Sequence, residues 1–164
     1  VPVDLARVAR ETFDGVADRL RVAGYSLSFD APDVSVEALA DREAVIRVLL
    51  NLLSNAEKYS GDARDIAVSA GTEPDGRRCF VSVADRGIGV PRAHRSRIFR
   101  EFHRVDASLT SEKGGTGLGL SIARSLARAM GGDVTYAPRE RIDGGTGSVF
   151  TLALPLAPKK DGTA

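Results

Sequence analysis

Apolar positions along the chain follow two periods, which predict helices and strands. The helical period of about 3.6 residues predicts a first helix over residues 4–23, with Asp4 as its N-cap and Gly24 just past its end. A longer helix is predicted to start at Asp41, and a third to cover residues 118–130. Period-two alternation predicts strands over residues 25–29, 34–36, 66–70, 79–84, 134–136 and 148–154.

The order of these elements predicts the fold class. Residues 73–76 are turn-like, so the strands on either side of them are expected to form a hairpin. After Gly89 the periodicity becomes irregular, with a short helical piece predicted over residues 93–102 and a polar stretch over 103–113. We expect residues 1–156 to form one α/β (α+β) domain, a two-layer α/β sandwich whose mixed, mostly antiparallel sheet of about five strands packs on three helices. Residues 157–164 are expected to be a disordered tail.

Composition narrows the choice of partners and compartment. The 164 residues have a net charge of +1, so no bulk attraction to nucleic acid or to an anionic membrane is expected. The single cysteine, Cys79, argues against a disulfide scaffold and favours a reducing, cytoplasmic compartment. No segment resembles a membrane span or a signal peptide. The start at Val1 rather than Met indicates a processed form or an excised fragment.

Polar side chains line one face of the long helix predicted after Asp41. Asn51, Asn55, Lys58 and Tyr59 fall on one side, roughly opposite the apolar stripe. Asparagine is a poor helix former, so two of them on this face suggest a site. The amide oxygen of Asn55 is a suitable Mg²⁺ ligand, and Lys58 would supply positive charge for phosphates. A solvated face with a helix-terminal lysine is the alternative that this segment leaves open.

A carboxylate followed by glycines stands at the end of the strand predicted over residues 79–84. Asp85 at the tip of a strand can accept a hydrogen bond from an exocyclic amine, and the flanking Gly87 and Gly89 let a planar base approach the backbone. Adenine fits this description. A simple turn capped by Asp85 is the alternative.

Four glycines lie within residues 114–119, directly ahead of the third predicted helix. Glycine lets backbone N–H groups converge on an anion at a helix N-terminus, which favours a phosphate site. The chain has no Gly-Lys-Ser/Thr, and the glycine spacing is not G-x-G-x-x-G, so neither a P-loop nor a dinucleotide fingerprint is present. A glycine-rich loop without a ligand is the alternative for this run alone.

Together and in this order, the three segments resemble the N, G1 and G2 boxes of the GHKL, or Bergerat-fold, ATPase superfamily. Within it they are most similar to the catalytic and ATP-binding domain of bacterial sensor histidine kinases. Residues 51–60 (NLLSNAEKYS) resemble the N box, 85–89 (DRGIG) the G1 box and 115–120 (GTGLGL) the G2 box. Residues 98–106 (IFREFHRVD) are similar to the F box, and the resemblance spans residues 3–155.

The resemblance implies a role in base binding for the G1 box and the end of the N box. Asp85 would bind the adenine amino group, with Gly87, Ile88 and Gly89 beside it. Tyr59 would line the base or ribose pocket.

The resemblance also implies how the phosphates would be held. Asn55 would coordinate Mg²⁺ bridging the ATP phosphates, and Lys58 and Arg104 would approach phosphate oxygens. Residues 103–113 would form a mobile ATP lid, anchored by Phe99 and Phe102. The triphosphate would be wrapped by the G2 residues Gly115, Thr116, Gly117, Leu118, Gly119 and Leu120.

One position distinguishes branches of the superfamily. ATP-hydrolysing members have a water-activating glutamate four residues before the Mg²⁺ asparagine, where this chain has Asn51. An amide cannot act as a general base, so efficient hydrolysis is not expected. The resemblance therefore implies a domain that holds ATP for attack by an outside nucleophile.

The phosphoacceptor histidine of the family is not recognisable in this chain. Neither His94 nor His103 is followed by the acidic residue typical of the acceptor site. The expected activity is therefore donation of the γ-phosphoryl group to a histidine on a separate dimerisation domain of the same parent, with no autophosphorylation by this domain alone. A response regulator would act downstream, and the isolated domain is expected to be monomeric. A nucleotide-binding regulatory module without transfer activity and a GHKL ATPase are the alternatives.

Overall fold

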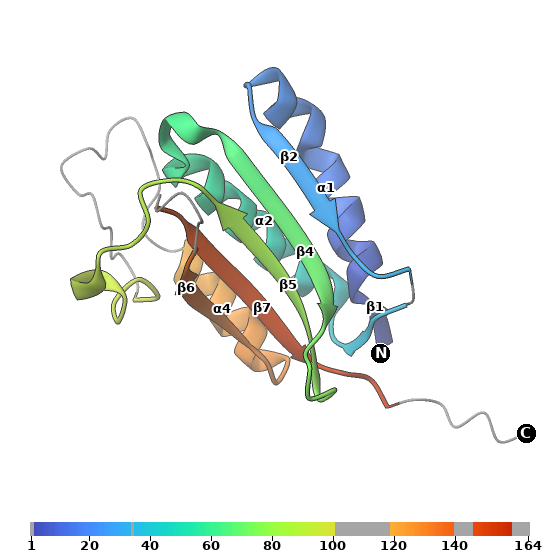
Figure 1. Cartoon of the computed structure of the whole chain (residues 1–164). Helices are drawn as coiled ribbons and strands as arrows, with labels where there is room; N and C mark the ends of the chain where they lie inside the picture. The colour runs from blue at the N-terminus through green and yellow to red at the C-terminus, as the bar shows by residue number, and fades with distance from the viewer. Residues whose placement is uncertain (1, 34, 101–118, 140–145, 159–164) are drawn as a thin grey trace, which may run out of the picture.

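The computed structural model describes residues 2–33, 35–100, 119–139 and 146–158, which form two layers (Figure 1). One layer is a five-stranded sheet, and the three α-helices of the described residues cover one of its faces. The α/β sandwich predicted from the sequence is confirmed. The helices are α1 (Leu5–Val22), α2 (Arg42–Tyr59) and α4 (Gly119–Ala129). The strands of the sheet are β2 (Ser26–Asp30), β4 (Asp65–Thr72), β5 (Arg78–Asp85), β6 (Asp133–Pro138) and β7 (Ser148–Pro155).

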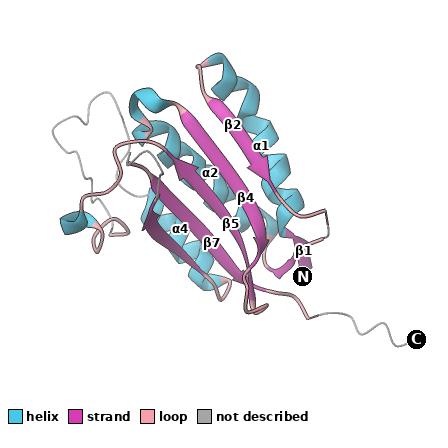
Figure 2. Cartoon of the chain, in the orientation of Figure 1, coloured by secondary structure: helices cyan, strands magenta, loops and turns pink. Residues whose placement is uncertain are grey.

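The sheet is mixed and mostly antiparallel, as expected (Figure 2). Its strand order is β2-β4-β5-β7-β6, in which only β2 and β4 run parallel. The predicted hairpin joins β4 to β5, and the Glu73 N–H donates to the Arg78 carbonyl at 2.9 Å across its turn. This order makes β5 the central strand, so its C-terminal end is covered by neighbours on both sides.

The two long helices begin at side-chain caps. Asp4 Oδ1 accepts a hydrogen bond from the Arg7 N–H at 3.2 Å at the start of α1, and Asp41 Oδ1 accepts one from the Glu43 N–H at 3.0 Å at the start of α2. Past the end of α1, Gly24 adopts a φ of +92°, a conformation that glycine adopts without strain. The predicted cap at Asp4 and the predicted stop at Gly24 are both confirmed.

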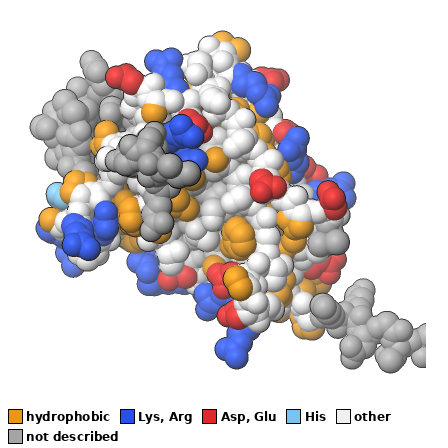
Figure 3. Space-filling model, viewed as in Figure 1, with side chains coloured by type: hydrophobic (Ala, Val, Ile, Leu, Met, Phe, Trp, Pro, Cys, Tyr) orange, Lys and Arg blue, Asp and Glu red, His pale blue; other side chains and the backbone are white. Residues whose placement is uncertain are grey.

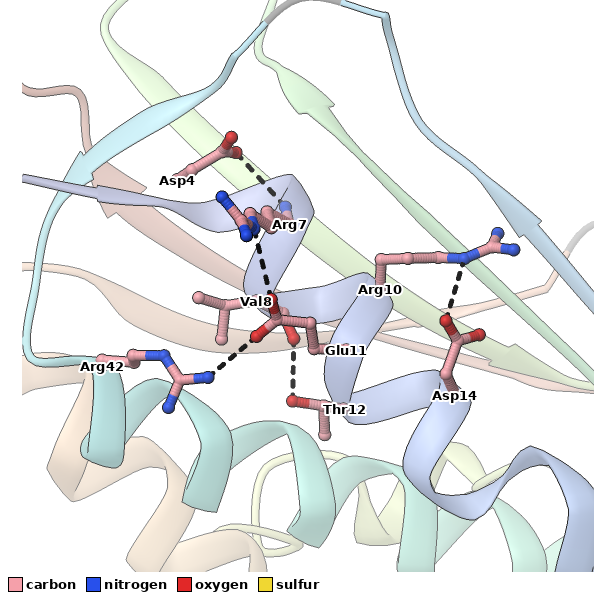
Figure 4. Close-up of polar contacts among 8 residues, drawn as sticks. All are labelled: Asp4, Arg7, Val8, Arg10, Glu11, Thr12, Asp14 and Arg42. Atoms are coloured by element: carbon pink, nitrogen blue, oxygen red, sulfur yellow. Dashed lines mark hydrogen bonds and ion pairs between the residues drawn. The ribbon is translucent and has the colours of Figure 1, made fainter.

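Glu11 links α1 to the start of α2 (Figure 4). It accepts hydrogen bonds from Arg7 Nε on its own helix (3.2 Å) and from Arg42 Nη2 on α2 (2.8 Å), and these bonds lower its pKa. The Thr12 hydroxyl turns inward and donates to the Val8 carbonyl at 2.8 Å. Because exposed ion pairs add little stability, the apolar face of α1 contributes more. Its buried side chains include Leu5, Val8, Phe13 and Leu20.

A row of hydroxyl side chains crosses the face of the sheet turned away from the helices. Strand register aligns Ser69, Ser82, Thr151 and Thr135 in one row, and the Ser82 and Thr151 hydroxyls lie 2.8 Å apart. Figure 3 shows this face with charged side chains gathered mainly near its margins. Hydroxyl groups in the middle remain compatible with water, so the sheet needs no third layer.

Two predicted segments differ from the structure. The strand expected over residues 34–36 lies instead at β3 (Glu37–Leu39), which pairs with the unpredicted β1 (Pro2–Asp4). Val36 precedes that strand and is buried, and its carbonyl accepts the Leu5 N–H at 2.8 Å. This long-range pairing, which local alternation cannot register, shifts the strand.

The helical piece expected over residues 93–102 is not an α-helix in its described part. It contains the 3₁₀ turn η2 (Arg92–His94), followed by turns up to Arg100. Its bonds span three residues rather than four: the His94 N–H donates to the Pro91 carbonyl, and the Arg97 N–H to the His94 carbonyl, both at 2.9 Å. Residues 101 and 102, including Phe102, lie outside the described residues.

The chain stays attached to the domain just beyond β7. Leu156 forms a bridge with Ala38, and the Ala157 N–H donates to the Glu37 carbonyl at 2.9 Å. Residues 159–164, which hold most of the predicted tail, lie outside the described residues, as does the glycine pair 144–145. Among the helices that are described, none combines the length and apolar character needed to cross a bilayer.

Cys79 lies in the core at the start of β5. Its side chain is fully buried, its thiol is 3.5 Å from the Leu154 carbonyl, and burial raises its pKa to about 11. Because the thiolate is the reactive form, we expect Cys79 to resist a water-soluble disulfide reagent at mildly alkaline pH until denaturant unfolds the chain. Release of the reagent's chromophore measures this. Complete reaction of the folded chain within seconds would contradict the burial.

Candidate functional site

Asp85 ends the central strand as a buried carboxylate. Its exposed fraction is 2%, and the Gly87 N–H donates to its Oδ1 at 2.8 Å. Burial is the largest effect on Asp85 and raises its pKa, although hydrogen bonds from the Gly87 and Ser148 backbones and the charge of Arg139 act to lower it. The backbone donors and the nearby cation counteract part of the effect of burial, and in its ionised form the carboxylate can only accept hydrogen bonds.

The turn after Asp85 packs directly on the end of α2. The Ile88 N–H donates to the Tyr59 carbonyl at 3.3 Å, and a Cβ at Gly87 would overlap that same carbonyl oxygen. Gly89 adopts a φ of +71°. Glycine is thus required at position 87 by close backbone approach and favoured at 89 by conformation. Ile88 between them is half exposed.

Residues at the start of β7 cover the turn from the other side. The Thr146 hydroxyl donates to the Gly87 carbonyl at 2.5 Å, and a Cβ at Gly147 would overlap the Asp85 carbonyl oxygen. The Arg139 N–H donates to the Gly147 carbonyl at 3.1 Å, and Arg139 Nη1 is buried with no hydrogen-bond partner among the described residues. Sequence reasoning missed these residues, although the glycine next to Ser148 at the start of a strand was a signal of close approach.

The polar face of α2 lies partly under α4. Asn51, Asn55 and Tyr59 are half-buried, whereas Lys58 is exposed. A Cβ at Gly119, the first residue of α4, would lie 3.8 Å from Asn51 Oδ1. The structure therefore brings the predicted N-box amide and the last part of the G2 run together.

Contacts with α1 and the chain after it hold the C-terminal end of α2. The Tyr25 hydroxyl donates to the Glu57 carbonyl and lies against the Ser60 hydroxyl, both at 2.9 Å. The Glu57 carboxylate accepts two hydrogen bonds from Arg19, at 2.7 and 3.1 Å. The end of α2, on which the Asp85 turn packs, is thus held by hydrogen bonds to Arg19 and Tyr25.

The donors available for a metal ion are amides rather than carboxylates. Among the described residues, no three His, Cys, Asp or Glu side chains are grouped to hold a metal. Asn55 offers one amide oxygen on a half-buried helical face. Such a donor fits Mg²⁺, which commonly takes one or two protein ligands and completes its shell with phosphate oxygens and water.

Several predicted phosphate contacts cannot be placed. Arg104, Gly115, Thr116, Gly117 and Leu118 lie outside the described residues, as does the whole predicted lid, residues 103–113. Gly119 and the half-buried Leu120 form the first turn of α4.

Comparisons with known proteins agree with this arrangement. Residues 40–158 match the family described as histidine kinase-, DNA gyrase B-, and HSP90-like ATPase. The sensor histidine kinase WalK of Bacillus subtilis is 35% identical over 130 residues, which are 79% of this chain and 21% of WalK. The sensor-like histidine kinase SenX3 of Mycolicibacterium smegmatis is 36% identical over 133 residues, which are 81% of this chain and 33% of SenX3. The chain thus spans a fifth to a third of these relatives.

Solved structures of histidine kinases share the fold. The catalytic domain of the histidine kinase ThkA matches with a TM-score of 0.79 and 27% identity, covering 96% of this chain and 98% of that domain. The mycobacterial sensor histidine kinase MprB matches with a TM-score of 0.80 and 26% identity, covering 96% and 99%. The chain belongs to the histidine kinase-, DNA gyrase B- and HSP90-like ATPase family, as a catalytic and ATP-binding domain of the sensor histidine kinase type.

Proposed function

We propose that this chain binds Mg-ATP and donates its γ-phosphoryl group to a histidine on a separate dimerisation and phosphoacceptor domain of the same parent protein. The observation that supports this most is the contact between the buried Asp85 turn and the end of α2, made by Gly87, Ile88 and Tyr59. It joins Asp85, the carboxylate proposed to bind the base, to the helix face that bears Asn51 and Asn55. One nucleotide could therefore span both.

Adenine would bind at the Asp85 end. The carboxylate would accept a hydrogen bond from the exocyclic amine, while its contact with the Gly87 N–H keeps it oriented. Gly87, which packs on the Tyr59 carbonyl, would lie beside the base with Ile88 and Gly89, and Tyr59 would line the base or ribose pocket. The Asp85 end would therefore determine the specificity for the base, and the phosphates would lie near α2 and α4.

The phosphates would bind along α2 and the start of α4. Asn55 would hold Mg²⁺ through its amide oxygen, and Lys58 and Arg104 would approach phosphate oxygens. Bound there, the metal would neutralise charge that builds up on the phosphoryl oxygens. Backbone groups would wrap the triphosphate at Gly115, Thr116, Gly117, Leu118, Gly119 and Leu120.

Asn51 supports transfer to a protein rather than to water. Its amide has no basic lone pair to activate a water molecule, so ATP hydrolysis by the chain alone should be slow. In the proposed step, a neutral imidazole nitrogen of the acceptor attacks the γ-phosphorus and forms an N–P bond. The bond to the β,γ-bridging oxygen breaks with its electron pair, and ADP leaves. This chain contributes positioning and charge neutralisation.

The metal role of Asn55 gives a testable prediction. Asn55→Ala should weaken ATP binding in the presence of Mg²⁺ more than in its absence, because only the metal-dependent part uses the amide oxygen. Calorimetric titration with and without chelator measures both affinities. Ser54→Ala, on the exposed neighbouring position of α2, is the control and should leave both unchanged. Equal losses in the two conditions would contradict a Mg²⁺ role for Asn55.

Phosphoryl transfer is tested with γ-labelled ATP and the acceptor domain of the parent protein. The mixture should give an acid-labile, base-stable phosphoprotein, whereas this chain alone should remain unlabelled. Label on serine would contradict the proposal. ATP binding without transfer would instead favour a nucleotide-binding regulatory module, and rapid ATP turnover by the isolated chain would favour an ATPase.

We propose that the domain works with a response regulator in a reducing compartment. ThkA has been seen in complex with the response regulator protein TrrA, which supports a response regulator as the downstream partner here. The buried thiol of Cys79 is compatible with a reducing cytoplasmic compartment. We propose a monomeric domain that meets its acceptor as part of a longer chain.

A further inference from the structure

Thr146 lies two residues before β7, against the turn that follows Asp85. Its hydroxyl donates to the Gly87 carbonyl at 2.5 Å. A Cβ at Gly89, the other glycine of the turn, would lie 3.9 Å from the Thr146 Cβ. Thr146 itself is exposed, whereas Gly87 is buried. The threonine side chain therefore covers a buried carbonyl of the turn on the side that faces solvent.

Strand register explains why Thr146 meets Gly87. β7 pairs antiparallel with β5, and Ser148 lies opposite Asp85. Thr146 is two residues before Ser148 and Gly87 is two residues after Asp85, so the same register brings them together just past the end of the ladder. Gly147 permits the close approach, because a Cβ there would overlap the Asp85 carbonyl oxygen. The place of Thr146 is thus determined by the central strands of the sheet.

The peptide unit that joins Gly87 to Ile88 is held from two sides. Its carbonyl accepts the Thr146 hydroxyl, and its N–H donates to the Tyr59 carbonyl at 3.3 Å. A peptide unit of this kind has one donor and one acceptor, so both of its polar groups are in use. The two hydrogen bonds attach the same peptide plane to the start of β7 and to the end of α2.

These bonds matter because glycine restricts its own backbone very little. Gly87 and Gly89 stand on either side of Ile88, so the conformation of the turn depends on contacts with its neighbours. Gly87 lies between the held peptide and the end of β5, and its N–H donates to Asp85 Oδ1 at 2.8 Å. A Gly87 that is fixed in this way keeps the carboxylate in one orientation.

We propose that Thr146 is a positioning residue for adenine, which acts by fixing the Gly87–Ile88 peptide and through it the Asp85 carboxylate. This inference rests on the proposed function, in which Asp85 accepts a hydrogen bond from the exocyclic amine of the base. Such a bond depends on direction, so a carboxylate with a freer orientation should bind the amine less well. Loss of the Thr146 hydroxyl should therefore weaken nucleotides that have the amine and spare a purine nucleotide without it.

The test compares Thr146→Val with the unchanged chain by calorimetric titration in Mg²⁺. The two ligands are ATP and purine riboside triphosphate, which lacks the exocyclic amine. Valine has nearly the shape of threonine and removes only the hydroxyl, at an exposed position where the core is not disturbed. Thr146→Val should weaken ATP binding about fivefold, the loss expected for one neutral hydrogen bond, and leave the affinity for purine riboside triphosphate unchanged. A variant that is only less stable would weaken both equally.

Two further variants separate the hydroxyl from other effects of the substitution. Thr146→Ser keeps the hydroxyl and should bind ATP as tightly as the unchanged chain. Thr151→Val makes the same chemical change within β7, where the hydroxyl lies 2.8 Å from that of Ser82 on the face of the sheet turned away from the helices. It is the matched control and should leave both affinities unchanged.

Four results would overturn the inference: an unchanged ATP affinity in Thr146→Val, equal losses for its two nucleotides, an equal loss in Thr151→Val, or a Thr146→Ser variant as weak as Thr146→Val. Failure of the proposed function would look different. If the unchanged chain binds the two nucleotides equally, the adenine contact of Asp85 is wrong, and if it binds neither, the proposed function is wrong. Either result would also remove the basis of the inference about Thr146.

Discussion

Replacement of Asp85 by asparagine should weaken ATP binding by a factor of about 10 to 150, which corresponds to about 1.5–3 kcal/mol for a hydrogen bond to a charged group. Asparagine keeps the size of the side chain but replaces one acceptor oxygen by an N–H₂ donor. The Gly87 and Ser148 backbones already approach this carboxylate as donors. The new donor must therefore face either a backbone N–H or the adenine amine, and both contacts are unfavourable.

The same variant should discriminate less against guanine, because the new donor can face the O6 carbonyl of that base. Calorimetric titration with ATP and GTP measures both effects. Asp65→Asn is the matched control, since Asp65 pairs with Arg86 at 3.0 Å at the start of β4 and has no predicted nucleotide contact. Unchanged ATP affinity in Asp85→Asn would show that Asp85 does not contact adenine.

Replacement of Gly87 by alanine should damage both the fold and the site. The added Cβ would overlap the Tyr59 carbonyl oxygen and lie 2.8 Å from Ser60 Cα, and backbone atoms cannot rotate away as a side chain can. The turn and the end of α2 must then separate, which breaks the hydrogen bond from Ile88 to Tyr59. We expect a loss of about 1–3 kcal/mol in the free energy of unfolding and at least about a tenfold loss in ATP affinity.

Denaturant unfolding and calorimetry measure these two quantities. Gly15→Ala makes the same chemical change in the exposed part of α1, where nothing lies within 4 Å of the added Cβ. It should leave ATP affinity unchanged and raise the free energy of unfolding by up to about 1 kcal/mol, because alanine is the better helix former. A Gly87→Ala variant as stable and as tight-binding as the unchanged chain would contradict the close packing of the turn on α2.

Local patterns predicted those parts of the fold that depend on local chemistry. Asp4 was recognisable as a helix cap and Asp41 as the start of a helix, and the turn-like residues 73–76 lie between two antiparallel strands in the structure. Asp85 was recognisable as the acidic residue at a strand end, and it lies there. In each case the residues that predict the feature and the residues that form it are only a few positions apart in the sequence.

The parts that were missed or misplaced depend on pairing between distant segments. β1 and β3 are each three residues long, which is too short for an alternation of apolar and polar residues to show. They are strands because they pair with each other. Ser148 and Thr146 meet the Asp85 turn only because β7 pairs with β5 in one particular register. Phe99 was expected as an anchor, but its partner Arg124 is 25 positions along the chain (124 − 99) on another element. No local pattern in one sequence reports such contacts.

The structure describes more of the base end of the proposed nucleotide site than of its phosphate end. At the base end, Asp85, Gly87, Ile88, Gly89 and Tyr59 all lie among the described residues. Glycine is needed at two positions there, because a Cβ at Gly87 would overlap the Tyr59 carbonyl and a Cβ at Gly147 would overlap the Asp85 carbonyl. The phosphate end is described at Asn51, Asn55 and Gly119, whereas Arg104 and Gly115 stay predictions from the resemblance. Binding experiments that separate base from phosphate therefore test the two ends independently.

The most direct test of the proposed nucleotide site is a crystal structure of this chain with Mg²⁺ and a non-hydrolysable ATP analogue. We expect the adenine amine within hydrogen-bond distance of the Asp85 carboxylate and the metal on the Asn55 amide oxygen, with the phosphates beside Gly119. An analogue bound elsewhere, or with its base away from Asp85, would contradict the proposed site.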